Sequence, residues 1–153
     1  MLDATFDGYW MKSAYRVPDN DCVCVPVGGK PQTTRPISRL NIRSFLTSHQ
    51  DGDTLPAGRS VELRGIAFDG GAGIARVGIS TDDGRIWLEA RLGEDLGRYS
   101  FREWRVPVLL PKGEHRVKVR AVSSSGETQP LEPLWQPSGY MRNVVETVTL
   151  RVV

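Results

Sequence analysis

Apolar and polar side chains alternate most regularly in two stretches of the chain, residues 74–81 and 115–122. Successive side chains of an extended chain point to opposite sides, so every second residue shares a face. In the second stretch Val117, Val119 and Ala121 form an apolar face, while basic residues lie on the other. This pattern is typical of strands that bury one face and expose the other. The two stretches therefore predict two strands of an all-β domain.

Further stretches of the same kind are separated by turn residues: 39–46, 61–68, 86–92, 101–109 and 144–153. In the second of them, Gly65 indicates a bulge or a close approach of neighbouring groups. Pro107 in the fourth lacks an N–H, which predicts a sheet edge or a bend. With about seven strands at short spacing and no convincing helix, the expected fold is an immunoglobulin-like β-sandwich.

The turn from Ser80 to Trp87 has the spacing S-x-D-x-G-x-x-W of an Asp-box hairpin. In such a hairpin the carboxylate accepts hydrogen bonds from turn amides, and the aromatic ring covers the apolar side. Glycine supplies the positive φ that a tight turn needs. A single copy argues against a propeller built from repeated boxes. We therefore assign a structural role in the hairpin to four residues: Ser80, Asp82, Gly84 and Trp87.

Residues 1–36 lack this alternation and form an irregular N-terminal segment. Five large apolar or aromatic side chains crowd between residues 6 and 15, with a spacing that fits one or two helical turns. So short a segment cannot build its own core, and it requires a partner surface on the following domain or on an upstream one. Residues 21–36 are expected to be a linker or a surface loop. We place the sandwich at residues 37–153.

The overall composition excludes several classes of protein. Apolar residues make up 39% of the chain and charged residues 25%, as is ordinary for a soluble globular protein. A formal net charge of +2 is too small to indicate a nucleic-acid partner, whose ligands usually carry a concentrated basic face. No run of about 18 apolar residues exists, so no membrane span is expected.

The two cysteines, Cys22 and Cys24, are separated by a single residue in a polar segment. That spacing is awkward for a disulfide between them, and a C-x-C pair without histidine is a poor metal site. We expect two incidental thiols on a loop.

The two histidines, His49 and His115, belong to no metal-binding pattern such as H-x-H. Neither a nucleophile elbow nor a phosphate-binding loop is present. We therefore expect no catalytic residue and no metal ligand in this chain. A small hydrolase that uses His115 with Glu114 is the weakest hypothesis, since it lacks a nucleophile. A free-standing immunoglobulin-like module that binds a carbohydrate or a protein is the main alternative, and exposed aromatic surfaces at Trp104 or Trp135 would favour it.

Residues 134–143 form an unusual loop in which Trp135 and Tyr140 bracket a Pro-Ser-Gly turn and Arg142 follows. The guanidinium and the turn amides could face an anion or a partner protein. Alternatively, the loop is packed and its tryptophan covers the end of the sandwich. We name Arg142, Tyr140 and Ser138 as candidates for the approach of a substrate anion.

Several parts of the chain, in this order, resemble bacterial sulfite oxidases and sulfite dehydrogenases that carry a molybdenum cofactor. Residues 9–16 resemble the exit segment of their molybdenum-cofactor domain. Four later parts of the chain resemble the C-terminal dimerisation domain of these enzymes: residues 64–87, 119–122, 129–130 and 135–143. Family positions that look structural are matched by Arg76, Trp87, Trp135, Gly139 and Asn143.

The resemblance implies that the chain is the C-terminal dimerisation fragment of a larger enzyme and is not catalytic by itself. The parent would oxidise sulfite or a related sulfur compound at a molybdenum–molybdopterin centre and pass electrons to a cytochrome. The family's cysteine ligand to molybdenum lies upstream, so Cys22 and Cys24, which follow the exit segment, do not match it. The implied partners are the upstream molybdopterin domain and a second copy, paired through the β-sandwich. The implied location is the bacterial periplasm.

One position departs from the family that the chain resembles. In animal sulfite oxidases an arginine just before the position of Gly139 leans toward the substrate anion, and here that position is Ser138. Similar bacterial sequences often read Gly-Tyr-x-Arg-Asn, as residues 139–143 do, so Arg142 could take a similar role. The departure leaves two substrates open, free sulfite and a bound sulfur species.

Overall fold

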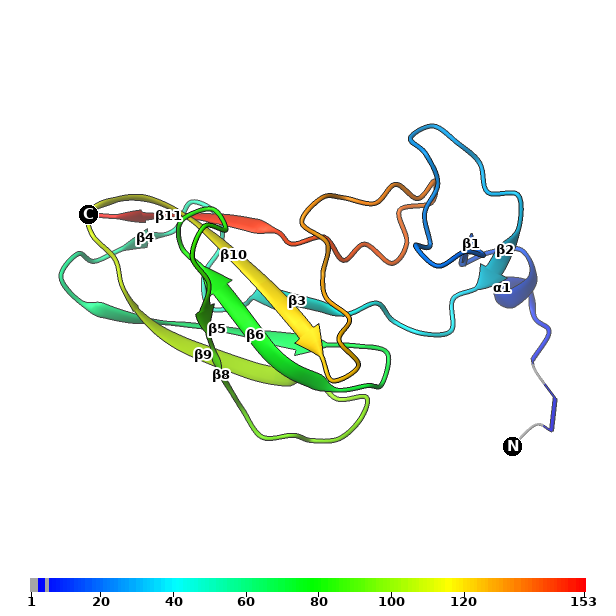
Figure 1. Cartoon of the computed structure of the whole chain (residues 1–153), viewed down its shortest axis with the longest axis horizontal. Helices are drawn as coiled ribbons and strands as arrows, with labels where there is room; N and C mark the ends of the chain where they lie inside the picture. Colours follow the sequence, from blue (N-terminus) through cyan, green and yellow to red (C-terminus); the bar gives the residue numbers. More distant parts are fainter. Residues whose placement is uncertain (1–2, 5) are drawn as a thin grey trace.

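The computed structural model describes residues 3–4 and 6–153, and residues 1, 2 and 5 of the predicted N-terminal segment lie outside the described residues. Two β-sheets pack face to face at one end of an elongated molecule (Figure 1). A small two-stranded sheet and a single helical turn lie at the other end, near the N-terminus. The predicted all-β sandwich is therefore confirmed.

The four-stranded sheet is antiparallel and has the order β3-β5-β9-β8. Its strands are β3 (Arg43–Leu46), β5 (Ser60–Phe68), β9 (Arg102–Leu109) and β8 (Arg91–Leu92). Because β8 pairs only with Arg105 and Trp104, Pro107 lies beyond the end of that strand. The position agrees with the sheet edge that proline predicts.

The five-stranded sheet has the order β4-β11-β10-β6-β7, and only the β11–β4 pair is parallel. Its strands are β4 (Thr54–Leu55), β11 (Thr147–Val152), β10 (Gly113–Ser123), β6 (Ile74–Ser80) and β7 (Leu88–Glu89). Six of the seven predicted stretches each overlap one strand of the two sheets, and the stretch 86–92 overlaps two. Only the two-residue β4 falls outside them, in a segment that the sequence presents as turns.

The predicted return strand over 86–92 is split between the two sheets. Leu88 and Glu89 pair with β6, whereas Arg91 and Leu92 pair with β9. Ala90 lies at the crossing, where its side chain is buried and its N–H donates to the carbonyl oxygen of Val77 (2.8 Å). The prediction of one continuous strand over 86–92 was therefore wrong. The small side chain of Ala90 fits between the sheets, so the chain passes from one sheet to the other at this residue.

The core lies between the sheets and consists of the alternating apolar residues. Val117, Val119 and Ala121, the predicted inward face of β10, are all buried, as are Leu63 and Trp104 of the opposite sheet. Burial of apolar surface contributes about 25 cal/mol for each Å² removed from water, so this layer supplies the main stabilisation.

Gly65 is explained by close packing in the core. A Cβ atom at this position would lie 2.2 Å from the carbonyl oxygen of Phe45 and 2.2 Å from the ring of Trp104. Gly65 stays in register with both Leu46 and Trp104, so the close approach, and not a bulge, is the reason for glycine.

The N-terminal segment is more ordered than a linker. A single helical turn, α1 (Tyr9–Lys12), precedes β1 (Arg16–Pro18), which pairs with β2 (Thr34–Pro36). The Arg16 guanidinium donates to the Thr34 hydroxyl (2.9 Å) and to the Met11 carbonyl oxygen (2.7 Å). The prediction of a linker or surface loop over 21–36 was wrong at its last residues, which form β2, because a strand of three residues shows too little periodicity to be recognised.

Candidate functional site

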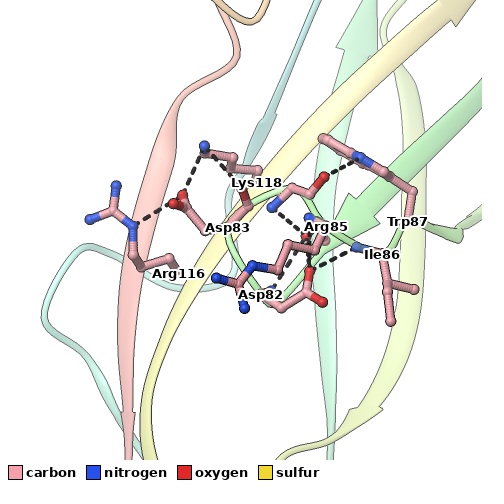
Figure 2. Close-up of polar contacts among 9 residues, drawn as sticks. Asp82, Asp83, Arg85, Ile86, Trp87, Arg116 and Lys118 are labelled. Atoms are coloured by element: carbon pink, nitrogen blue, oxygen red, sulfur yellow. Dashed lines mark hydrogen bonds and ion pairs between the residues drawn. The ribbon is translucent and has the colours of Figure 1, made fainter.

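The Asp-box hairpin is held by its own polar groups (Figure 2). One carboxylate oxygen of Asp82 accepts hydrogen bonds from the Ser80 hydroxyl (2.7 Å) and from the N–H groups of Arg85 (3.1 Å) and Ile86 (3.0 Å). The Ile86 amide, followed by the Ser80 hydroxyl, holds the pKa of Asp82 below its ordinary value. The Ser80 hydroxyl also accepts from the Gly84 N–H (2.8 Å).

The neighbouring carboxylate joins the turn to the adjacent strand. Asp83, whose φ is 64°, lies 2.8 Å from the Lys118 ammonium and 3.1 Å from the Arg116 guanidinium on β10. Hydrogen bonds first from Lys118 and then from Arg116 lower the pKa of Asp83. The Trp87 indole N–H donates to the Gly84 carbonyl oxygen (3.0 Å), and its ring lies beside Gly78. These groups are engaged with one another, which is the arrangement of a folding device.

The loop that carries the anion candidates lies between the sandwich and the N-terminal segment, in orange in Figure 1. It borders a cavity of about 270 Å³ whose walls come from two segments, 22–27 and 133–144, together with Asn41. Tyr140 and Arg142 both line this cavity. Ser138 does not; it borders a second opening beside Tyr15. Two of the three sequence candidates therefore share one cavity, and Tyr140 lines both openings.

Arg142 supplies the positive charge at this cavity. Its side chain is exposed, and it belongs to none of the ion pairs formed within residues 3–4 and 6–153. The neighbouring Met141 has φ 61° and Gly139 has φ 70°, so the chain turns sharply on both sides of Tyr140. An exposed guanidinium on such a turn can receive a carboxylate, sulfite or sulfate-like anion through its fork of N–H donors.

The N-terminal segment closes one side of the same cavity. The Tyr15 and Tyr140 rings stack with centroids 5.3 Å apart, and the Val25 N–H donates to the Trp135 carbonyl oxygen (3.0 Å). Trp10 and Tyr9 continue this row of rings outward and are exposed. Of the aromatic residues crowded into this segment, Tyr15 thus contacts the loop, and Tyr9 and Trp10 form an exposed surface beyond it.

Gln129 anchors the base of the loop, a role that the sequence did not reveal. Its carbonyl oxygen accepts from the Ser44 N–H (2.9 Å) on β3 and the Ala121 N–H (3.0 Å) on β10. Its amide donates to the Asn143 carbonyl oxygen (3.0 Å), and the side chain is fully buried. The Ser44 hydroxyl in turn accepts from the Trp104 indole N–H (2.9 Å). Glutamine side chains are usually exposed, so the sequence alone does not indicate that Gln129 joins the two sheets.

Cys22 and Cys24 form a disulfide, and the expectation of two free thiols was wrong. Val23 has φ 53°, a left-handed conformation that folds the three residues back on themselves. The Asn20 side chain binds both the N–H (3.2 Å) and the carbonyl oxygen (2.8 Å) of Cys24. The two Cα atoms are consequently 5.1 Å apart, within the range that a disulfide spans.

The remaining chemical candidates are occupied by local contacts. His115 contacts the Pro111 carbonyl oxygen (2.9 Å), and Glu114 is its neighbour on a strand, so the two side chains face opposite sides. His49 contacts the Ser48 hydroxyl (2.8 Å). Trp104 is buried and offers no platform for a carbohydrate, whereas Trp135 is 42% exposed.

Two kinds of feature are absent from the described part of the chain, metal-binding clusters and membrane-spanning helices. No group of three or more His, Cys, Asp or Glu side chains there could hold a metal ion. None of the helices formed by the described residues is long and apolar enough to cross a membrane.

Comparison with known proteins places these features in a family. The chain is 32% identical to the mitochondrial sulfite oxidase of Rattus norvegicus over 126 residues, covering 76% of this chain and 23% of that protein. It is 27% identical to the Homo sapiens enzyme over 155 residues, covering 94% and 28%. The NADH nitrate reductase of Lotus japonicus is 31% identical over 121 residues, covering 70% and 13%. The chain thus spans about a quarter of the length of the sulfite oxidases that it matches.

Solved structures show the same fold. The sulfane dehydrogenase SoxCD from Paracoccus pantotrophus superimposes with a TM-score of 0.67 at 21% identity, covering 93% of this chain and 36% of that one. Fibronectin(III)-like modules of Clostridium thermocellum CbhA give a TM-score of 0.50 at 14% identity, covering 80% and 53%. The model of the Mo-co oxidoreductase dimerisation domain matches residues 34–152, and the chain belongs to this family.

Proposed function

We propose that this domain pairs two copies of a sulfite oxidase-like molybdenum oxidoreductase and braces the catalytic domain of each copy. The family match over residues 34–152 is the observation that carries the proposal. In this proposal residues 37–153 are the pairing sandwich and residues 1–36 connect it to the molybdopterin domain. The whole enzyme oxidises sulfite or a related sulfur compound, passes electrons to a cytochrome, and works in the bacterial periplasm.

The residues of this chain do not fit the molybdenum cofactor. Molybdenum in this family takes a cysteine thiolate, and the sulfur atoms of Cys22 and Cys24 are bonded to each other. The cofactor in this proposal therefore belongs to the catalytic domain, and the two cysteines of this chain take no part in holding it.

Arg142 is the residue of this domain that we propose to act on the substrate anion. It is exposed beside Tyr140, at the edge of the sandwich that faces the N-terminal segment. In the whole enzyme Arg142→Gln should raise KM for sulfite roughly tenfold, the loss expected of one charge-assisted hydrogen bond, while kcat changes less. The exposed Arg59→Gln is the matched control. A KM unchanged by Arg142→Gln would remove this residue from the site.

The choice of a sulfur substrate also needs a direct comparison, because the matched relatives include a nitrate reductase. Steady-state assays of the whole enzyme with sulfite plus cytochrome c, and with nitrate plus a reduced dye, separate the two activities. We expect turnover with sulfite only. Reduction of nitrate at a comparable kcat/KM would replace the proposed reaction.

Pairing is tested by size-exclusion chromatography with light scattering. We expect twice the 17.0 kDa mass of one chain at micromolar concentration. Two charge reversals then locate the interface: Arg76→Glu on the outer face of the five-stranded sheet and Arg105→Glu on that of the four-stranded sheet. Both arginines are exposed, and each directly precedes a buried core residue, Val77 or Val106. The interface lies on the sheet whose variant becomes monomeric, and a monomeric unmodified chain at every concentration would contradict the proposal.

A further inference from the structure

The Cys22–Cys24 disulfide differs from structural disulfides in three respects. It closes a loop of only three residues, so it removes little entropy from the unfolded chain. Its middle residue, Val23, is β-branched and has φ 53°, a conformation that costs energy for such side chains. Cys22 is exposed, and Cys24 is half-buried. Disulfides that are exposed or held in a strained loop are the ones that exchange readily.

The disulfide also forms part of the wall of the Arg142 cavity. Cys22 and Val23 line this cavity together with Trp135, Tyr140 and Arg142. One residue beyond the disulfide, Val25 donates its N–H to the Trp135 carbonyl oxygen (3.0 Å). The folded-back conformation of residues 22–24 therefore determines how the chain meets the 133–143 loop. An exposed guanidinium in the same cavity attracts anions toward the sulfur atoms.

We propose that Cys22–Cys24 is a reactive site for anionic sulfur nucleophiles, thiolates or sulfite, and that its opening releases one wall of the Arg142 cavity. This inference is independent of the pairing proposed above, because it concerns only the N-terminal segment and the loop that it touches.

The chemistry needs no group beyond the nucleophile. A thiolate attacks the exposed Sγ of Cys22, the S–S bond breaks, and its electron pair leaves on Sγ of Cys24 as a thiolate. A second thiolate then attacks the reductant's sulfur in the mixed disulfide and releases Cys22. Cys22 and Cys24 have together gained two electrons, and the two reductant molecules have become joined in a disulfide. Sulfite reacts by the same first step and leaves an S-sulfonate on Cys22 and a thiolate on Cys24, with no further oxidant.

Intact-mass analysis after alkylation tests the reactivity on the folded protein. We expect the purified protein to contain no free thiol, two free thiols after incubation in a glutathione buffer, and one sulfonate plus one thiol after incubation with sulfite. Opening in either arm supports the site, and the added mass identifies the nucleophile. Two free thiols in the air-purified protein, or opening in neither arm until denaturant is added, would overturn it.

Val23→Asn tests whether the backbone at residue 23 causes the reactivity. Asparagine tolerates a left-handed conformation, so the closed ring should be stabilised and the thiol-to-disulfide ratio needed to open it should rise roughly fivefold. The matched control is Val153→Asn, an exposed valine at the C-terminus that does not line the cavity, which should open like the unmodified protein. Equal opening of all three proteins would overturn the role of the strained residue.

Hydrogen–deuterium exchange tests the release of the cavity wall. Reduction, or the pair of substitutions Cys22→Ser and Cys24→Ser, should speed exchange in peptides covering 20–27 and 133–143. Exchange in β10 should stay unchanged, since its core contacts are remote from the ring. Unchanged exchange in the two peptides after complete reduction would show that the disulfide does not hold the wall.

Discussion

Residues 37–153 bury the apolar side chains of their strands, whereas the aromatic residues before them remain largely exposed. Leu63, Val77 and Ile79 are fully buried, while Tyr9 is 65% exposed and Trp10 59% exposed. The N-terminal segment is held by pairwise contacts: the β1–β2 pairing, the stack of Tyr15 on Tyr140, and a disulfide.

This difference separates what the two regions need in order to fold. The sandwich draws its stability from apolar area, which a single surface change alters little. The N-terminal segment depends on a few local links, each of which is worth a small amount and can be removed alone. We therefore expect substitutions in the sandwich to change global stability and substitutions in the segment to change only local order.

The largest effect should come from exchanging tryptophan for alanine in each region. Trp104→Ala leaves a cavity in the core and removes the hydrogen bond to Ser44, and should cost about 3–5 kcal/mol in free energy of unfolding. Trp10→Ala, at an exposed position, should cost less than about 0.5 kcal/mol. Urea denaturation followed by circular dichroism measures both. Similar losses for the two variants would erase the distinction between the regions.

Gln129→Met should give the next largest effect. The substitution keeps the volume but leaves the N–H groups of Ser44 and Ala121 and the carbonyl oxygen of Asn143 without their partner. Because each unsatisfied buried group costs about 1–3 kcal/mol, we expect a total loss of about 2–4 kcal/mol after relaxation. Gln136, a half-buried residue of the largely exposed 134–143 loop, supplies the control, and Gln136→Met should cost below about 1 kcal/mol. Equal denaturation midpoints would contradict the role of Gln129 in joining the sheets.

The Asp box predicts a smaller effect that depends on pH. The pKa of Asp82 is lowered in the folded protein, so its ionised form stabilises the fold above the ordinary value of 3.8. This contribution is lost as the pH falls through the folded value. The Tm of Asp82→Asn should therefore lie below that of the unmodified protein at pH 7, and the difference should shrink as the pH falls below 3.8. A constant difference between them would mean that the charge of Asp82 contributes nothing.

The smallest global effect is expected for Tyr15→Ala. Removing the ring stack should speed hydrogen–deuterium exchange in residues 133–143 and change the free energy of unfolding by less than about 0.5 kcal/mol. Tyr99→Ala, at a position that is 77% exposed, should alter neither. A large loss of stability in Tyr15→Ala would show that the segment is part of the sandwich's folding unit.

The sequence was sufficient for most of the sandwich because burial on one face leaves a repeating signal. The alternation around Val119 identified inward residues that are buried in the structure. Gly65 was recognised because a missing side chain within a strand has few causes, and the structure shows close packing as the cause.

The features that escaped prediction depend on contacts between distant residues. Nothing near Gln129 in the chain indicates that its amide reaches Ser44 and Asn143. The Cys22–Cys24 disulfide depends on a left-handed Val23, which is unusual for valine and cannot be anticipated from composition. The sequence located the candidate loop at 134–143. It did not indicate that Ser138 and Arg142 line different cavities, because that depends on how the loop packs against the N-terminal segment.

The amide of Gln129 joins the two sheets through hydrogen bonds, whereas antibody domains join theirs through a sulfur–sulfur bridge. An amide neither ionises in the physiological range nor exchanges with thiols. We expect the paired sheets to stay intact when the surroundings turn reducing, and sensitivity to reductants to be confined to the end of the molecule that carries the cysteines.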